Sequence, residues 1–248
     1  MARITAINKT HHRDIKIRRD KVEAQSANSH MIPVVVSEFL KAATQYPIVF
    51  TKNRETGKFA CVALCGFEPG ENLFWRNGEW DGIYVPLNVA RQPFFIGSDD
   101  ANGSAFVLCI DVESECIDQT EGEALFDAQG DETEYLQSVQ AIMGQLVDGE
   151  SQTGKFTEKL IEYELLTELS LDIKFDNDDK QKIQGIYTVN EEKLNAIAHD
   201  ALAALHTAGY LPWIYAMVVS LGHIYGLVHR KNTALAKAQQ WYQADGEQ

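Results

Sequence analysis

The residues best suited to hold a ligand lie in one aromatic stretch, residues 75–95, WRNGEWDGIYVPLNVARQPFF. Its tryptophans and tyrosine combine flat apolar faces with a polar edge, and its arginines can stack on such faces or grip a carboxylate through two hydrogen bonds. This combination suits a peptide, an aromatic amino acid or a sugar. The stretch therefore predicts a ligand-binding site formed by Trp75, Arg76, Trp80, Tyr84 and Arg91.

The same stretch has a second interpretation, as an irregular piece of core. Aromatic side chains usually serve packing, so Trp80 and Phe94 would fill the interior while Arg91 bonds carbonyl groups of the connection. The segment NGEWDG is typical of a loop. The two interpretations differ in whether the aromatic and arginine side chains face a cavity.

A metal site is the second chemical possibility. His12 and Asp14 have the H-x-D spacing of facial-triad iron sites, which a distant histidine would complete. Such a pair arises easily by chance, and the neighbouring Arg13 and Arg18 would oppose a cation. The candidate third ligands are His199, His206 and His223. The first two of these cannot bind one ion together, because residues seven apart on a helix lie about 10 Å apart.

Other catalytic and metal-binding patterns find no match. The acidic segments DVESECIDQTEGE and FDNDDK do not form EF-hand loops, because Cys116 takes the place of the required glycine in the first and Lys180 that of a ligand in the second. The chain also lacks G-x-S-x-G, H-E-x-x-H and the glycine-rich phosphate-binding patterns. No cofactor is therefore predicted, and any catalytic residue stays unknown.

Charge is unevenly distributed along the 248 residues, whose net charge is −14. Residues 1–21 carry seven Lys or Arg and two acids, which leaves 15 and 34 for the remainder, a balance of −19. Such an acidic body repels phosphate backbones, so no nucleic-acid partner is expected. The basic residues of the arm are expected to pair with the chain's own acids.

The four cysteines indicate reduced thiols in the core. Cys61, Cys65 and Cys109 stand among apolar neighbours, and the first two would lie about 13 Å apart on a strand, too far for a disulfide or one metal ion. The N-terminal residues do not follow the order of a signal peptide. These observations predict a cytoplasmic protein.

Residues 211–228, LPWIYAMVVSLGHIYGLV, form a run without formal charge. Its 18 residues are marginal for a spanning helix, and the i, i+3, i+4 spacing of its apolar residues favours a helix buried in a protein core, so a membrane partner is not expected. Gly222 and Gly226 would let another helix approach closely, and Leu235 and Trp241 could contact a partner chain. A homo-oligomer is therefore possible.

Apolar periodicity predicts strands and helices in blocks, without strict alternation. Helices are expected over 37–46, 132–148, about 155–166, 190–209 and from 211 onward, with Ser37, Thr153 and Asn190 as N-caps. Strands are expected in MIPVVV, IVFTKN, KFACVALCGF, SAFVLCIDVES, ELSLDIKF and KIQGIYTV, the fourth of them central. This order predicts an α+β fold, with a mostly antiparallel sheet packed with amphipathic helices and a buried C-terminal helix. A basic arm over 1–30 would precede a single domain over 31–248.

Several short motifs recur in the order and spacing of a known family. They are EFLKAATQYPIVF, CGFEPGENLFW, GIYVPLNVARQPFF, GEALFDAQGDETEYL, KLIEYELL, IQGIYTVNEEKLNAI and LHTAGYLPWIYAMVVSL. Together they resemble the bacterial SapC family over nearly the whole chain. The resemblance implies little chemistry, because the family is named from an association with surface layers and has no established catalytic residues to carry over. Its genes often neighbour those of flavin-dependent halogenase-like and cupin-like enzymes, which implies an accessory role.

Three hypotheses for function follow. The first is a non-enzymatic binding or accessory protein that takes a peptide or small aromatic ligand for a partner enzyme. The second is a metal-dependent modifying enzyme of the non-haem iron kind, built on His12 and Asp14. The third is a structural protein of the surface layer, which the family name alone suggests.

Overall fold

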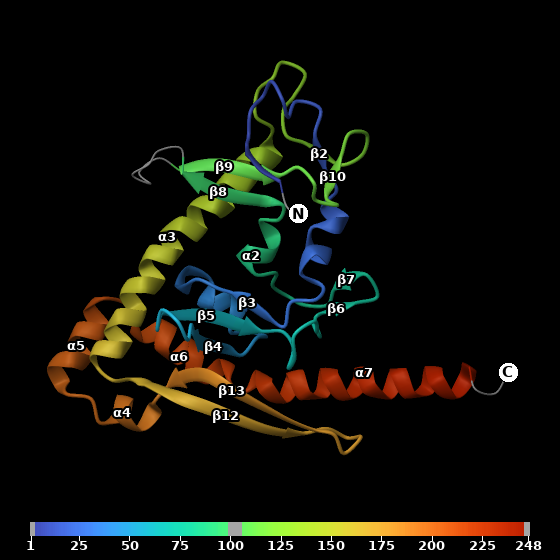
Figure 1. Ribbon diagram of the computed structural model, residues 1–248. Coiled ribbons are helices and arrows are strands. Elements are labelled where there is room, and N and C mark those ends of the chain that lie inside the picture. The colour runs from blue at the N-terminus through green and yellow to red at the C-terminus, as the bar shows by residue number, and fades with distance from the viewer. Residues whose placement is uncertain (1–2, 99–105, 246–248) are drawn as a thin grey trace. The chain divides into compact units, whose positions relative to one another are not determined.

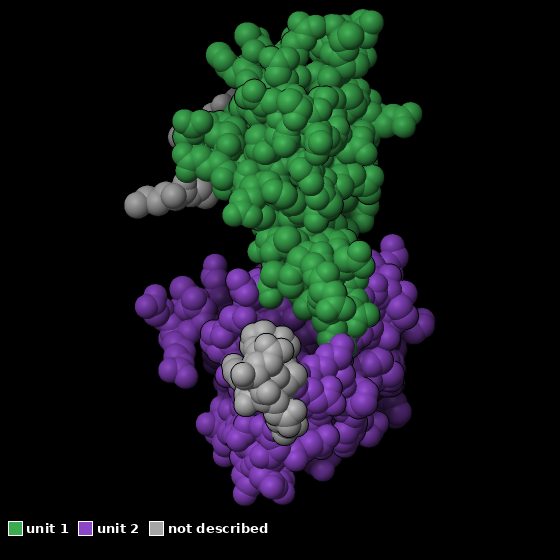
Figure 2. All heavy atoms as spheres, turned by 90° about the vertical axis from the view of Figure 1, so that its right-hand side faces the viewer, with its two compact units in different colours: residues 1–27, 75–81, 85–151 green, residues 28–74, 82–84, 152–248 purple. Residues whose placement is uncertain are grey.

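The computed structural model describes residues 3–98 and 106–245, and the chain divides into two compact units. Unit 1 comprises residues 1–27, 75–81 and 85–151, and unit 2 comprises residues 28–74, 82–84 and 152–248 (Figure 2). Each unit gathers segments that are distant in sequence. The arm over 1–30 and the single domain over 31–248 stay predictions.

Unit 1 is built on a three-stranded antiparallel sheet (Figure 1). Its strand order is β1 (Ile4–Ala6), β9 (Phe106–Asp111), β8 (Phe94–Ser98). The central place predicted for the SAFVLCIDVES strand is confirmed for its described part, which begins at Phe106. Cys109 and Ile110 are both buried, so both faces are covered at this end of the strand.

The remaining strands of unit 1 are two residues long. β2 (Lys16–Ile17) lies between β10 (Ile117–Asp118) and β11 (Glu123–Ala124), and β6 (Trp75–Arg76) pairs with β7 (Glu79–Trp80). Short helical turns complete the unit: η1 (Arg19–Lys21), η2 (Glu23–Ser26) and α2 (Leu87–Ala90).

The basic arm pairs with the acids of its own unit, as predicted. Arg18 forms ion pairs with Asp20 at 2.7 Å and with Glu121 at 3.3 Å, and Arg19 lies 3.8 Å from Glu123. Glu121 and Glu123 belong to the segment that contains β10 and β11, whereas Asp20 lies in the arm itself. Residues 3–27 of the arm therefore include two strands, β1 and β2, and two turns, η1 and η2, of unit 1, and Arg18 and Arg19 pair with acidic residues of the 111–134 region.

The two helices expected over 132–148 and 155–166 are one helix, α3 (Glu134–Glu162). No proline interrupts its 29 residues, so the backbone hydrogen bonds continue across the predicted gap. The N-cap is Thr133, whose Oγ1 accepts from Leu136 N at 3.3 Å. Thr153 lies inside the helix, and its Oγ1 accepts from Val36 N at 3.0 Å within unit 2.

Unit 2 holds a five-stranded antiparallel sheet. Its order is β12 (Leu166–Lys174), β13 (Lys180–Val189), β4 (Ile48–Lys52), β5 (Phe59–Leu64), β3 (Met31–Pro33). The predicted hairpins β4–β5 and β12–β13 are confirmed by their antiparallel registers. With the helices below, these antiparallel sheets confirm the predicted α+β fold.

The helices of unit 2 are shorter than the periodicity predicts. They are η3 (Val36–Glu38), α1 (Phe39–Ala42), α4 (Glu191–Asn195), α5 (His199–Thr207), α6 (Leu211–Ser220) and α7 (His223–Asp245). Ser37 lies within η3, so it does not cap a helix as predicted. Asn190 caps α4 as predicted, because its side chain accepts a hydrogen bond from Lys193 N at 2.9 Å. Gly209 ends α5 with a φ of +73°, as predicted.

The buried C-terminal helix is α6, which lies along β4 and β13 (Figure 1). Ile214, Ala216, Met217 and Ser220 are buried on it, whereas α7 buries Leu227 among its residues 223–240. By length and composition, the stretch Leu211–Gln240 could cross a membrane, and 22% of its apolar window is buried. The prediction of burial thus holds for α6 and is wrong for most of α7. The side chain of Trp241 lies outside the described part.

Candidate functional site

The segment NGEWDG, expected as a loop, contains most of a tight hairpin. Trp75 pairs with Trp80, and Arg76 pairs with Glu79. The two turn residues, Asn77 and Gly78, have φ values of +54° and +84°. Two consecutive positive φ values define a type I′ turn, which Asn-Gly favours and whose twist fits a two-residue hairpin. The sequence signal for this hairpin was therefore present.

The hairpin places its two tryptophans differently. Trp80 is buried, at 9% exposure, while Trp75 is half-buried. The backbone of Trp80 hydrogen-bonds the carboxyl of Glu23, whose pKa is raised mainly by burial. Arg76 lies 3.8 Å from Asp81 in an ion pair. Trp80 thus packs inside unit 1, as its core interpretation predicts, and ligand binding by Trp75, Arg76 and Trp80 stays a prediction.

Tyr84 belongs to unit 2, where it is part of a buried polar cluster. Its hydroxyl donates to Glu38 Oε2 at 2.8 Å, and Tyr46 donates to its carbonyl. Glu38 is 2% exposed and also accepts from Val35 N at 3.1 Å. Burial, followed by the charge of Glu38, raises the pKa of Tyr84. These contacts give Tyr84 a structural role, and its role in ligand binding stays a prediction.

Arg91 is anchored at the end of α2. Its Nε donates to Asn88 Oδ1 at 2.9 Å, and its Nη1 donates to the carbonyl of Phe94 at 2.6 Å. The guanidinium lies over the ring of Phe95, 4.7 Å from its centre. Burial lowers its pKa, and within the described ranges no carboxylate forms an ion pair with it. The predicted bond to a carbonyl of the connection is confirmed.

Arg91 also lines a cavity of about 810 Å³ in unit 1. The wall is made by α2, β8, β9 and α3, and its apolar members are Phe95, Ile96, Phe106, Met143, Leu146 and Val147. Phe106 is 64% exposed, so a large aromatic face opens onto this space. Asp148 and Glu150 also line the cavity and are exposed. Arg91 is thus the one predicted site residue that the structure places in this cavity.

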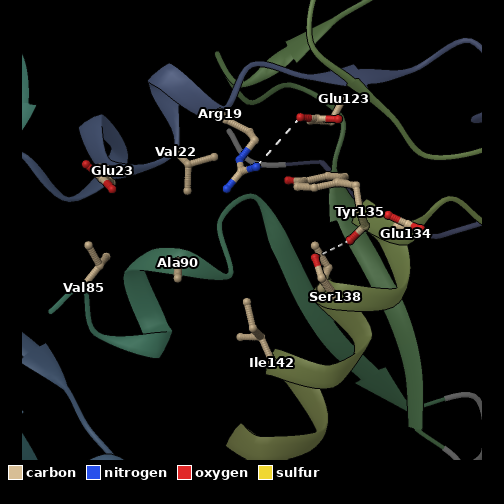
Figure 3. A pocket seen from close by; sticks show the side chains of 11 residues that line it. Arg19, Val22, Glu23, Val85, Ala90, Glu123, Glu134, Tyr135, Ser138 and Ile142 are labelled. Atoms are coloured by element: carbon tan, nitrogen blue, oxygen red, sulfur yellow. Dashed lines mark hydrogen bonds and ion pairs between the residues drawn. The ribbon is translucent and has the colours of Figure 1, made fainter. Parts of the chain in front are cut away.

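A second cavity in unit 1, of about 460 Å³, is more acidic (Figure 3). Tyr135 reaches from α3 toward Arg19, which pairs with Glu123 (Figure 3). Burial raises the pKa of Tyr135. Three carboxylates, those of Glu23, Glu123 and Glu134, line it against one guanidinium. Its apolar wall consists of Val22, Val85, Ala90, Val139 and Ile142.

The relationship of this chain to other proteins follows from one comparison. The family model for SapC matches residues 7–227. The chain belongs to the SapC family. No curated protein and no solved structure matches it. The resemblance carried by the seven short motifs is thereby confirmed, and every residue that lines the two cavities described above lies within the matched span.

The geometry of His12 in this SapC-family chain leaves no ring nitrogen open to a metal. Its Nδ1 accepts from Asn8 N at 2.9 Å, so the neutral ring carries its proton on Nε2, which lies 3.2 Å from Thr5 Oγ1. His12 is buried, and burial lowers its pKa, whereas Asp14 is exposed. Among residues 3–98 and 106–245, no three His, Cys, Asp or Glu side chains are grouped to hold a metal ion.

Sequence reasoning missed most of the wall around Arg91. Met143 and Leu146 belong to the helix expected over 132–148, whose apolar face is expected to pack against the rest of the protein. Both are buried, but the neighbouring Val147 and Phe106 are not, and the space in front of them remains open. An apolar pattern predicts which face of a helix will be buried, but it does not predict how completely the neighbouring side chains fill the space in front of that face.

Proposed function

We propose that this SapC-family protein is a non-enzymatic binding or accessory protein, which holds a peptide or small aromatic ligand for a partner enzyme. The observation that carries the proposal is the cavity at Arg91. Its volume, about 810 Å³, lies in the range of roughly 300–1,000 Å³ that is usual for small-molecule sites. Its wall is largely apolar, with a small number of polar groups to orient a ligand, which is the usual composition of such sites.

Filling the cavity tests the proposal. Val147→Trp adds an indole at the cavity wall, whereas Val219→Trp adds the same group at a position of α6 that is 70% exposed. Saturation-transfer NMR with peptides and small aromatic compounds would measure binding to the wild type and to both variants. We expect binding to the wild type and to Val219→Trp, and its loss in Val147→Trp. No binding to the wild type at millimolar concentration would refute the proposal.

The hairpin provides a second arm of the same experiment. Trp75 and Trp80 were predicted to touch the ligand, and tryptophan fluorescence reports on their surroundings. A ligand that quenches or shifts the emission of the wild type, and no longer does so after Trp75→Phe, would extend the site to the hairpin. Unchanged emission on saturation, with binding seen by NMR, would confine the site to the Arg91 cavity.

We also propose that the protein is cytoplasmic. All four cysteines are buried and none of them forms a disulfide, which fits a reducing compartment. In a soluble protein, the apolar stretch Leu211–Gln240 would supply the core helix α6 and the first part of α7, most of which lies outside the core. Fractionation of cells followed by immunoblotting is the test, and recovery of the protein in the membrane pellet after a carbonate wash would contradict this location.

A further inference from the structure

Most N–H groups of the Arg91 guanidinium form no hydrogen bond with the described residues. A guanidinium has five N–H groups, of which Arg91 uses one on Nε and one on Nη1. Within residues 3–98 and 106–245, no acceptor takes the three that remain on Nη1 and Nη2. The two bonds and the Phe95 ring fix the plane of the group, so its free end is oriented before any ligand arrives.

We infer that the ligand of this cavity is a small organic carboxylate, which pairs with Arg91 and lays its apolar body against Phe95, Phe106 and Met143. The inference rests on the proposed function and names the ligand class of the same site. A half-buried guanidinium with no carboxylate partner among the described residues is complementary to an anion. Arg is favoured over Lys for this task because its fork matches the two carboxylate oxygens.

The surroundings favour one negative charge over two. Among the described residues, Arg91 is the only basic one that lines this cavity, so a phosphate would bring a charge without a partner. Asp148 and Glu150 are exposed on the same wall and would repel a second negative group. Burial lowers the pKa of Arg91, and no carboxylate among the described residues offsets this effect. Arg91 is therefore suited to a ligand that carries a single carboxylate.

The apolar part of the cavity wall determines which kind of apolar group in the ligand fits best. Phe106 is 64% exposed, and an apolar group placed on it would remove that ring from water. One face of Phe95 is covered by Arg91, and a second ring can meet the rest of the Phe95 ring in an offset or edge-to-face arrangement. The flexible side chain of Met143 can adapt to either a ring or a branched chain. An aromatic acid fits this wall best.

The decisive experiment compares two probes that differ in charge and little else. Binding of 3-phenylpropionate and of its neutral amide, 3-phenylpropionamide, is measured by NMR titration on the wild-type protein. A charge-assisted hydrogen bond contributes roughly 1.5–3 kcal/mol, so the amide should bind about 10–100-fold more weakly. Decanoate, as a third probe, separates an aromatic from a straight-chain body, and phenylsuccinate, a dianion, should bind more weakly than the monoanion.

Variants locate the effect at Arg91. Arg91→Gln should remove the preference for the acid over the amide, and Arg91→Lys should retain part of it, since the charge stays and the fork is lost. Arg54→Gln is the matched control, because it makes the same change at an exposed position between β4 and β5 of unit 2. Arg76→Gln is a separate variant, which tests the other arginine predicted to bind the ligand. Circular dichroism checks that Arg91→Gln is folded. The comparison of acid with amide on the wild type needs no variant.

The outcomes separate this inference from the proposed function. Equal affinity for the acid and the amide overturns the carboxylate inference and leaves a binding protein in place. No binding of any probe or peptide overturns both. A preference for the acid that is lost in Arg76→Gln and kept in Arg91→Gln moves the anion site to the hairpin and overturns the assignment to Arg91.

Discussion

The Oγ of Ser220 on α6 accepts a hydrogen bond from the backbone N–H of Ile48 at 2.9 Å, although the two residues are 172 positions apart. The same hydroxyl donates to the carbonyl of Met217 at 2.6 Å. Ser220 and Ile48 are both fully buried. One hydroxyl therefore joins the first residue of β4 to the core helix of unit 2 and satisfies a donor that water cannot reach.

Ser220→Ala should destabilise the protein by about 1–3 kcal/mol, because it leaves the N–H of Ile48 buried without an acceptor. The free energy of unfolding in urea measures this. Ser138→Ala is the matched control, since Ser138 is exposed on α3 and its hydroxyl bonds a carbonyl of its own helix. Ser138→Ala should be neutral or slightly stabilising. Equal effects of the two substitutions would contradict the assigned role of Ser220.

Substitution by alanine should have opposite effects on stability at two glycines that have open space around them. Gly78 has a φ of +84° in the type I′ turn, so Gly78→Ala should destabilise by about 1–2 kcal/mol. Gly144 lies within α3, and a Cβ there meets nothing within 4 Å, so Gly144→Ala should stabilise by about 0.8–1 kcal/mol. Thermal and urea unfolding measure both, and the same sign for the two would refute the turn assignment.

Tyr84→Phe removes a hydrogen bond to the buried carboxyl of Glu38. Bonds to charged groups contribute roughly 1.5–3 kcal/mol, so a loss of that size in unfolding free energy is expected. Tyr225→Phe serves as the control, because Tyr225 is 83% exposed on α7. If Tyr84 acts in ligand binding only, its substitution will lower affinity and leave stability unchanged, which is the opposite of our expectation.

Glu23 gives a pH dependence whose sign follows from its raised pKa. The folded protein binds the Glu23 proton more tightly than the unfolded chain, so ionised Glu23 is unfavourable above the raised pKa. This cost disappears as the pH falls to the ordinary value of 4.5. Glu23→Gln should therefore be more stable than the wild type at pH 8, with the gain vanishing near pH 4. Urea unfolding at both pH values measures the difference.

The control for Glu23 is Glu158→Gln, which makes the same change on the exposed face of α3. Its effect on stability should be small at both pH values. A gain for Glu23→Gln that grows as the pH falls would reverse the sign and show that the carboxylate is stabilising in the folded state.

The sequence determined the local features of this protein. The α+β class, the hairpins β4–β5 and β12–β13, the Asn190 cap, the Gly209 stop and the pairing of the basic arm with acids all follow from patterns a few residues long or from charge balance. The SapC motifs fixed the family in the same way. These features are encoded locally because capping, turn chemistry and apolar period act between near neighbours.

The tertiary structure decided where those helices and strands end and which side chains are left exposed to solvent or to a cavity. It joined two predicted helices into α3, left most of α7 outside the core, and placed Tyr84 in unit 2 and the Arg91 cavity in unit 1. Whether an aromatic or a guanidinium is covered depends on segments far away in sequence, such as β9 and α3 around Arg91. Packing between distant segments has no local pattern, so only the folded chain shows that Arg91 faces open space.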